Sequence, residues 1–294
     1  MTAPFLGDDL GPRGKRLTRI VSAVSAAAIL AFIAIALTRL ADKGQLDEAR
    51  WRPFTQWPVQ KFFLEGLRVT VTVAVVSMVG AIVVGAIMAL ARLSRTPPVR
   101  WAATAYVEFF RGVPLILLIF FSALGLPRYG VELTLFWYLA LGLIVYNGAV
   151  LGEIFRAGIL SLDRGQSEAA YSLGMGYWQA MLLVVIPQAA RRMIPAIVSQ
   201  LVTLLKDTSL GAPIAYLELL RRARINGEFF GNPLQSLFVV AVMYIAVNFT
   251  LSRVARRLEV RQRRRLGAGQ IAVAGAGEDL AVVGAQGQAA IGKL

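Results

Sequence analysis

Lys206 and Asp207 place opposite charges side by side inside an apolar segment, and Thr208 and Ser209 follow directly. A cation, an anion and two hydroxyl groups are what a zwitterionic ligand requires for its carboxylate and its ammonium. The same charges also suit an ion pair between helices that only holds subunits together. Successive helical residues point about 100° apart, so the two charges need not pair with each other. Both interpretations stay open.

Glu153 and Asn147 are further polar residues within an apolar segment. Glu153 has Arg156 three positions later, which predicts a salt bridge between them at the edge of that segment. The alternative for Glu153 is a contact with a transported ligand. Asn147 is polar enough to line a path through the protein, and it serves helix packing equally well.

Arg111 lies in the short sequence Arg-Gly-Val-Pro, within another apolar segment. Gly112 and Pro114 after it predict a helix kink, with the charge of Arg111 beside backbone carbonyls that the kink frees. One role for Arg111 is therefore to stabilise the kink, and the other is to contact a ligand.

The composition excludes most catalytic chemistry. With no cysteine and no histidine, the chain has no disulfide, thiolate nucleophile or imidazole base, and no ordinary metal or haem site is expected. It also lacks the G-x-x-x-x-G-K-[ST] loop that binds nucleotide phosphates. We therefore expect no enzyme activity from the chain alone and no cofactor within it, so a partner must do any chemical work.

The apolar content predicts an integral membrane protein. Apolar residues make up 57% and charged residues 16%, whereas soluble domains carry about 25% charged residues. Six long apolar runs predict an all-α membrane protein with about six transmembrane helices. They cover residues 20–38, 67–91, 102–126, 133–155, 193–215 and 234–252. The run at 20–38 resembles a signal peptide but is longer than a usual cleaved one, so an uncleaved span is favoured.

The basic residues predict the orientation of the chain. Six spans place both termini on one side, and that side collects roughly twice as many Lys and Arg residues as the other. The termini are therefore expected in the cytoplasm, although the Arg-rich stretch 221–224 on the other side runs against this. The net charge of +14 is interpreted as this signal and not as nucleic-acid binding. The predicted parts are a cytoplasmic segment 1–19, a first helix 20–38, an external loop 39–65, a transmembrane domain 66–255 and a basic, then flexible tail 256–294.

A loop at 161–190, "EAAYSLGMGYWQAMLLVVIPQ" in its central part, is predicted to form a cytoplasmic elbow. Ser167 is expected to cap a helix that starts at Glu168, because a carboxylate suits the positive end of the helix dipole. Ala169 and Ala170 give that helix a narrow, smooth surface.

The second half of the elbow contains two glycines and a proline. Gly174 and Gly176 are expected to turn the chain, and a second helix is expected to end where Pro187 disrupts its hydrogen-bond ladder. From the residues alone, the elbow is either an amphipathic hairpin on the membrane surface or a docking element for a soluble partner.

The elbow resembles the "EAA" loop of type I ABC importer permeases. Its acidic residue and two alanines, the glycine at 174 and the apolar residues before Pro187 match that loop. The likeness extends to "YVEFFRGVPLILLIFF" (106–121), "EIFRAGILSLDRGQSEAA" (153–170) and "LLKDTSLGAPIAYLEL" (204–219), which together resemble the permeases of polar-amino-acid importers. The first helix, the external loop and the tail are similar to actinobacterial permeases of the glutamate-uptake type.

This resemblance implies a five-helix permease core with one additional helix before it. It implies that Glu168, Ala169, Ala170, Gly174 and Pro187 belong to coupling helices that fit a groove of a cytoplasmic ATPase, which binds ATP and Mg. It further implies an external substrate-binding protein and a second permease subunit, identical or different.

The expected function is that of a permease subunit in the cell membrane, which imports a polar amino acid, glutamate, with energy from the partner ATPase. Lys206, Asp207, Thr208, Ser209, Glu153, Arg111 and Asn147 are the candidate residues along the substrate path. The alternative is an ion-coupled carrier or a passive channel, in which the same charges act in gating or proton relay. A membrane scaffold that transports nothing would need these charges to be wholly structural.

Overall fold

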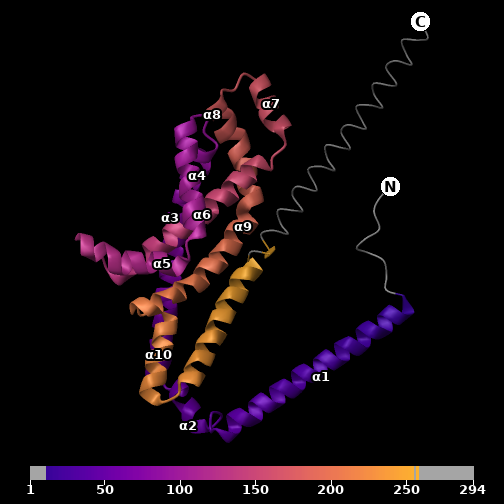
Figure 1. Ribbon diagram of the computed structural model, residues 1–294, viewed down its shortest axis with the longest axis vertical. Coiled ribbons are helices and arrows are strands. Elements are labelled where there is room, and N and C mark those ends of the chain that lie inside the picture. The colour runs from indigo at the N-terminus through magenta and orange to yellow at the C-terminus, as the bar shows by residue number, and fades with distance from the viewer. Residues whose placement is uncertain (1–10, 255, 258–294) are drawn as a thin grey trace.

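The computed structural model describes residues 11–254, 256 and 257, and this part of the chain is built from helices without strands (Figure 1). The predictions for the tail beyond residue 257 and for residues 1–10 concern residues outside the described part. The α-helices are α1 (Pro12–Asp42), α2 (Glu48–Trp51), α3 (Trp57–Arg92), α4 (Pro97–Gly112), α5 (Leu115–Phe120), α6 (Leu135–Leu160), α7 (Arg164–Ser172), α8 (Tyr177–Ala180), α9 (Ile186–Asp207), α10 (Leu219–Phe230) and a last helix, Pro233–Val254.

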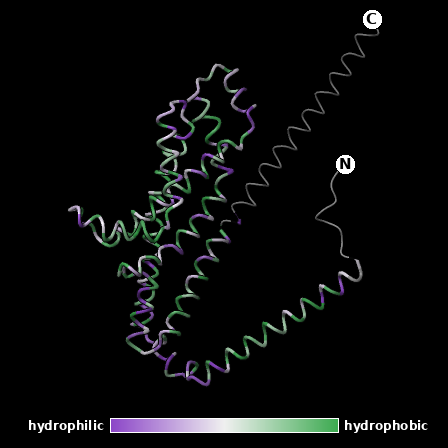
Figure 2. The backbone as a smooth tube through the Cα atoms, viewed as in Figure 1, coloured by the Kyte–Doolittle hydropathy of each residue, from purple (hydrophilic) through white to green (hydrophobic). Residues whose placement is uncertain are grey.

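Five described helices are long and apolar enough to cross a membrane, and a bent pair makes a sixth span if it is counted as one. They are α1, α3, α6, the continuous helix Tyr177–Ile214 and the last helix. Figure 2 shows the apolar character along α1, with hydrophilic residues gathered at the ends of the bundle. The sequence prediction of an all-α membrane protein with about six spans is confirmed.

Helices α3 and α6 cross closely at the centre of the bundle because glycines line the crossing. A Cβ on Gly85 would lie 2.8 Å from the Leu151 Cβ and 3.0 Å from the Gly152 nitrogen. A Cβ on Gly148 would lie 2.7 Å from the Val84 side chain. Within a membrane, close packing of small residues takes the place of water exclusion in holding helices together. The α3–α6 pair is therefore the framework for the other helices.

Three apolar clusters attach the remaining helices to the α3–α6 pair. One joins it to α9 through Leu151, Met193 and Leu204. A second joins it to α5 and to the turn after α9 through Ile119, Leu139 and Ile214. The third joins the start of α3 to α10 and the last helix through Phe63, Leu219 and Val240. Together these three clusters form the apolar packing of the bundle.

The span predicted at residues 102–126 is broken, as its Arg-Gly-Val-Pro sequence predicts. Helix α4 ends at Gly112, α5 begins at Leu115, and the two segments are bent by 102°. Val113 between them has an extended backbone because it precedes Pro114, whose ring disfavours helical geometry in the residue before it. The expected single run 102–126 is therefore two helices that point in different directions.

The span after α6, predicted at 193–215, begins earlier than predicted and passes through Pro187. A continuous helical segment covers Tyr177–Ile214, with a π turn at Met181–Val185 just before α9. Pro187 has no N–H to bond to the preceding turn, and the wider π turn accommodates its ring. The prediction that the helix ends at Pro187 was therefore wrong, as was the start at residue 193.

The described N-terminal segment meets the bundle near the turn between α10 and the last helix. Helix α1 begins at Pro12, before the predicted start at residue 20, and none of its most apolar stretch is buried. The predicted external loop 39–65 is shorter than expected, because α3 already begins at Trp57. In Figure 1, α1 runs away from the bundle and α2 lies beside the lower end of α10.

Segment 45–51 and the chain that follows α10 are joined by contacts from both sides, which we call the clamp. Arg50 donates to the Gly231 carbonyl at 2.8 Å, and Asn232 donates to the Arg50 carbonyl at 2.9 Å. Trp51 packs edge-on against Phe238 in the last helix, with ring centroids 5.7 Å apart. The clamp fixes the α2 end of α1 to the bundle.

Replacing Gly85 with alanine tests the close crossing. The added Cβ meets the backbone of α6, which cannot rotate away, so we expect Gly85→Ala to lower the free energy of unfolding by about 1–3 kcal/mol. Thermal unfolding of the purified protein in detergent measures the loss. Gly112→Ala is the control, since nothing lies within 4 Å of its added Cβ. Equal stability of the two variants would contradict the role given to Gly85.

Candidate functional site

The elbow between α6 and α9 is a short helix, α7, followed by a tight turn. Helix α7 begins at Arg164, and the Asp163 side chain caps it by accepting the Gly165 N–H at 2.8 Å. Ser167, the predicted cap, lies inside α7 and donates to the Arg164 carbonyl instead. The predicted start at Glu168 was therefore wrong, and Glu168, like its two alanine neighbours, lies in the body of α7.

Only one of the two elbow glycines has a backbone that requires glycine. Gly174 has φ +81°, in the left-handed region where a side chain is strained. Gly176 has φ −69° and precedes α8, where its N–H donates to the Gln179 side chain at 2.9 Å. The chain reversal therefore depends on Gly174, and Gly176 only begins the next helix.

Polar contacts connect the elbow to the membrane helices around it. Arg192 in α9 donates to the Ser161 carbonyl at the end of α6, at 2.9 Å. Gln188 in α9 donates to the Gln166 side chain of α7, also at 2.9 Å. The Arg95 guanidinium, in the turn after α3, lies 5.1 Å from the ring centre of Tyr177. Within the elbow, α7 is thus bonded directly to α9, and the segments on either side of α7 contact α9 and the turn after α3.

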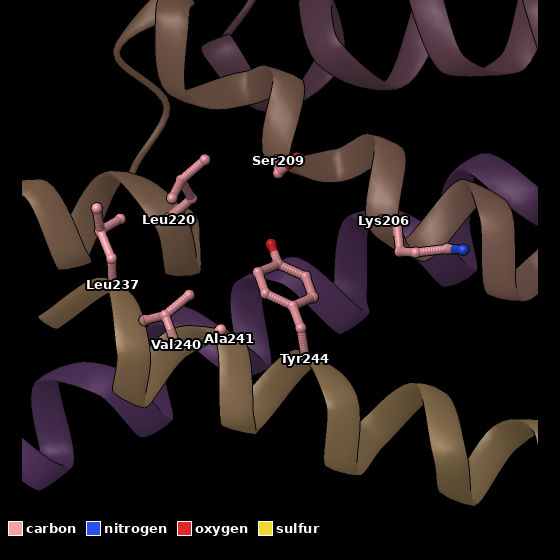
Figure 3. Close-up of a pocket in the computed structure, with 7 residues that line it drawn as sticks. All are labelled: Lys206, Ser209, Leu220, Leu237, Val240, Ala241 and Tyr244. Atoms are coloured by element: carbon pink, nitrogen blue, oxygen red, sulfur yellow. The ribbon is translucent and has the colours of Figure 1, made fainter. Parts of the chain in front are cut away.

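A pocket of about 300 Å³ opens beside the polar residues that end α9 (Figure 3). Lys206 and Ser209 line it from one side, and the last helix contributes Tyr244 and apolar residues. Figure 3 shows the Tyr244 hydroxyl pointing into the pocket, while the Lys206 side chain extends away from that hydroxyl. The lining combines apolar walls with a few polar groups, as small-molecule sites generally do.

Lys206 and Asp207 do not form a salt bridge with each other. Within residues 11–254, neither side chain lies within 4 Å of an oppositely charged group. Lys206 is exposed and Asp207 is partly buried. Thr208 is buried and donates to the Leu205 carbonyl at 2.6 Å, so its hydroxyl is already engaged. The charges of this pair are thus available to groups outside the single chain.

A buried carboxylate, Glu218, lies behind this pocket between two spanning segments. It caps α10 by accepting the N–H groups of Leu220 and Arg221 at 2.8 and 2.7 Å. The Tyr244 hydroxyl donates to it at 3.1 Å. Burial raises the pKa of the Glu218 carboxyl, although these hydrogen bonds act in the opposite direction. Because Tyr244 also lines the pocket, Glu218 fixes the orientation of one pocket wall.

Charged residues from three helices meet near the other end of the bundle. Arg156 donates to Glu153 at 2.6 Å, which confirms the predicted salt bridge in α6. Arg92, at the end of α3, bonds to the same carboxylate and lies 3.6 Å from Glu108 of α4. Arg111 lies three residues after Glu108 on α4 and forms no salt bridge within the described residues. We call these five residues the charge cluster.

Asn147 is fully buried and joins two helices. Its side-chain N–H donates to the Leu143 carbonyl at 2.9 Å, and its oxygen accepts from Gln200 of α9 at 2.7 Å. These bonds favour the packing interpretation of Asn147, because both ends of the amide are engaged.

Sequence reasoning missed Arg92, Glu108, Glu218 and Tyr244. Arg92, at the end of α3, was interpreted only as a signal of membrane orientation. Glu108 lies within the segment 106–121, which was interpreted only for its family resemblance, so nothing local indicated a partner for either residue. Glu218 precedes the apolar and basic start of α10, a position where an acidic cap is a recognisable signal.

Comparison with known proteins establishes the family. A family model described as "Binding-protein-dependent transport system inner membrane component" matches residues 81–264, more than half of the chain. The chain belongs to this family. It is a multi-pass membrane permease, and the matched region contains the elbow, the pocket and the charge cluster.

Individual relatives agree with this assignment. The permease is 38% identical over 231 residues to the glutamate transport system permease protein GluD of Corynebacterium glutamicum. This match covers 76% of this chain and 84% of that protein. The permease is 43% identical over 204 residues to the probable glutamine ABC transporter permease protein GlnP of Bacillus subtilis, covering 68% and 94%. The arginine transport system permease protein ArtQ of Bacillus subtilis is 34% identical, covering 69% and 93%.

A solved structure supports the fold of the permease. The chain resembles one described as "Crystal structure of an amino acid ABC transporter with histidines", with a TM-score of 0.65 and 30% identity. The likeness covers 70% of this chain and 94% of that one. The expected type I importer fold is confirmed, and the part outside the likeness leaves room for the additional first helix.

Replacing Glu218 with alanine tests its role behind the pocket. Glu218→Ala removes the cap of α10 and leaves the Tyr244 hydroxyl without its partner, so we expect a loss of about 1–3 kcal/mol in the free energy of unfolding. Thermal unfolding of the permease in detergent measures this loss. Glu132→Ala, at an exposed loop position, is the control. A stability equal to the control would contradict the structural role of Glu218.

Proposed function

We propose that this permease imports a polar amino acid, glutamate, and that a cytoplasmic ATPase supplies the energy. The family membership establishes a transport component, and the proposal adds the substrate and the partners. Relatives named for glutamate, glutamine and arginine support a polar amino acid. Glutamate is favoured because the relative that covers 76% of this chain carries that name.

A polar stripe on α9 is the observation that carries this proposal. Arg192, Ser199, Thr203 and Lys206 are all exposed in the single chain and recur at intervals of three, four and seven residues, along one side of the helix. Polar groups cost free energy against lipid hydrocarbon, so such a stripe faces water or another subunit. A path between two permease subunits satisfies this requirement and leaves the apolar sides of α9 packed on the α3–α6 pair.

The partners follow from the two ends of the permease. At the cytoplasmic end, the elbow docks in a groove of an ATPase that binds ATP and Mg, with Glu168, Ala169, Ala170, Gly174 and Pro187 in the coupling segment. At the external end, a binding protein delivers the substrate. A second permease subunit completes the path, and nucleic acid has no part in this function.

The orientation proposed places both termini in the cytoplasm. Basic residues at the start of α1 and near the end of the last helix support this, because positive charges near span ends are retained on that side. The elbow then faces the cytoplasm, and the clamp between segment 45–51 and the turn after α10 faces outward.

Substrate contacts are proposed at two levels. Lys206, Asp207 and Ser209 form the outer level, where the unpaired charges match the carboxylate and ammonium groups of an amino acid, and the buried Thr208 supports the backbone beside them. Glu153 and Arg111 belong to the inner level, in the charge cluster. Asn147 supports the path indirectly through its bond to Gln200.

The elbow glycines provide a matched pair of variants for testing ATP coupling. Gly174→Ala places a side chain at φ +81° and distorts the reversal, so we expect transport to fall strongly while the membrane helices stay folded. Gly176→Ala, at φ −69°, is the control and should transport normally. The assay is glutamate-stimulated ATP hydrolysis and glutamate uptake by the complex co-purified with its ATPase.

The same assay separates an importer from a carrier or channel. Glutamate flux that continues without any co-purifying ATPase, and that is indifferent to Gly174→Ala, would reject the ATP-driven function in favour of a carrier.

Replacing Asp207 with asparagine tests the outer level. The change keeps the size of the side chain and removes its charge, so we expect glutamate uptake to fall about tenfold or more with the permease still assembled with its partners. Uptake into vesicles and the yield of the co-purified complex are measured on the same preparation. Parallel loss of uptake and assembly would instead assign Asp207 to an ion pair between subunits.

A further inference from the structure

The charge cluster contains one cation more than it needs. It holds three arginines, Arg92, Arg111 and Arg156, and two carboxylates, Glu108 and Glu153. Glu153 is engaged by two of the arginines, and Glu108 by Arg92. In the described part of the chain, no carboxylate lies within 4 Å of the Arg111 guanidinium. The cluster therefore carries a surplus positive charge that is centred on Arg111.

The cluster is open on the side of α4. The Arg92 side chain is 11% exposed, whereas the Glu108 side chain is 63% exposed and Arg111 is also exposed. Both α4 residues lie in the bent pair of helices that counts as a sixth span if it is taken as one. Exposed charges in an apolar segment are costly against lipid, so this side of α4 faces either a water-filled space or another subunit.

Arg111 is also held in a position from which it can reach such a space. It lies in the last turn of α4, one residue before the helix ends at Gly112. The chain then bends by 102°, so no following turn of helix covers its guanidinium. The carbonyl groups at the C-terminal end of a helix favour a positive charge nearby. This effect stabilises the charge of Arg111 and leaves its N–H groups free to bind a ligand.

These observations point to an anion-binding position within the permease. We propose that Arg111 binds the side-chain carboxylate of an acidic amino acid on the cytoplasmic half of the path, with Arg92 and Arg156 keeping Glu153 from competing for it. A guanidinium binds a carboxylate through two parallel hydrogen bonds, which a neutral side-chain amide of similar shape accepts less strongly. This inference rests on the proposed import function and adds to it a reason for preferring glutamate to glutamine.

The test compares uptake of radiolabelled glutamate and glutamine into vesicles that contain the complete transporter. We expect Arg111→Gln to lower glutamate uptake about tenfold or more, which is the effect of losing a charge-assisted hydrogen bond, with glutamine uptake changed less than about threefold. Arg111→Lys keeps the charge without the paired donors and should give intermediate glutamate uptake. The yield of the complete transporter should match that of the wild type.

Arg100→Gln is the matched control, because Arg100 is an exposed arginine on the same helix, outside the cluster. Equal losses of glutamate and glutamine uptake would make Arg111 a stabiliser of the bend or a contact for the α-carboxylate that both substrates share, and either result would overturn the inference. Unchanged glutamate uptake in Arg111→Gln would overturn it as well. A wild-type transporter that shows no ATP-dependent uptake would reject the proposed function itself, which the variants do not affect.

Discussion

The close crossing of α3 and α6 is the constraint on which the other parts of the permease depend. Two backbones can approach this closely only where Gly85, Gly148 and Gly152 leave room, and neither helix can then shift without a clash. Helices α4 and α9 pack on this pair. The bonds from Asn147 to Gln200 and from Glu153 to Arg92 connect residues whose positions the crossing has already set.

The polar groups gather where helices break, and each break exposes backbone that needs partners. Arg111 stands at the bend between α4 and α5, Asp163 caps the elbow helix, and Glu218 caps α10. Regular helix satisfies its own backbone in a membrane, whereas these interruptions free backbone groups that side chains must bond. The bend, the elbow and the start of α10 therefore share the same kind of local irregularity, while Asn147 and Glu153 carry polar groups on regular helix.

The sequence predicted features that depend on near neighbours and missed those that depend on distant ones. The bend after Arg111 follows from a glycine and a proline within three residues, and the Glu153 pair with Arg156 follows from helical spacing. Arg92 lies far from Glu153 in sequence, so only the fold reveals their bond. Pro187 misled the prediction because a π turn absorbs its ring, and such a turn has no clear sequence signal.

The clamp that holds the α2 end of α1 uses backbone carbonyls as acceptors. Arg50 bonds to the carbonyl of Gly231, Asn232 to that of Arg50, and Gln235 to that of Gln45. A carbonyl is retained whatever side chain its residue carries, so the polar part of the attachment depends on three donor side chains, and Trp51 and Phe238 add an apolar contact. The attachment therefore tolerates substitution at its acceptor positions better than at its donor positions.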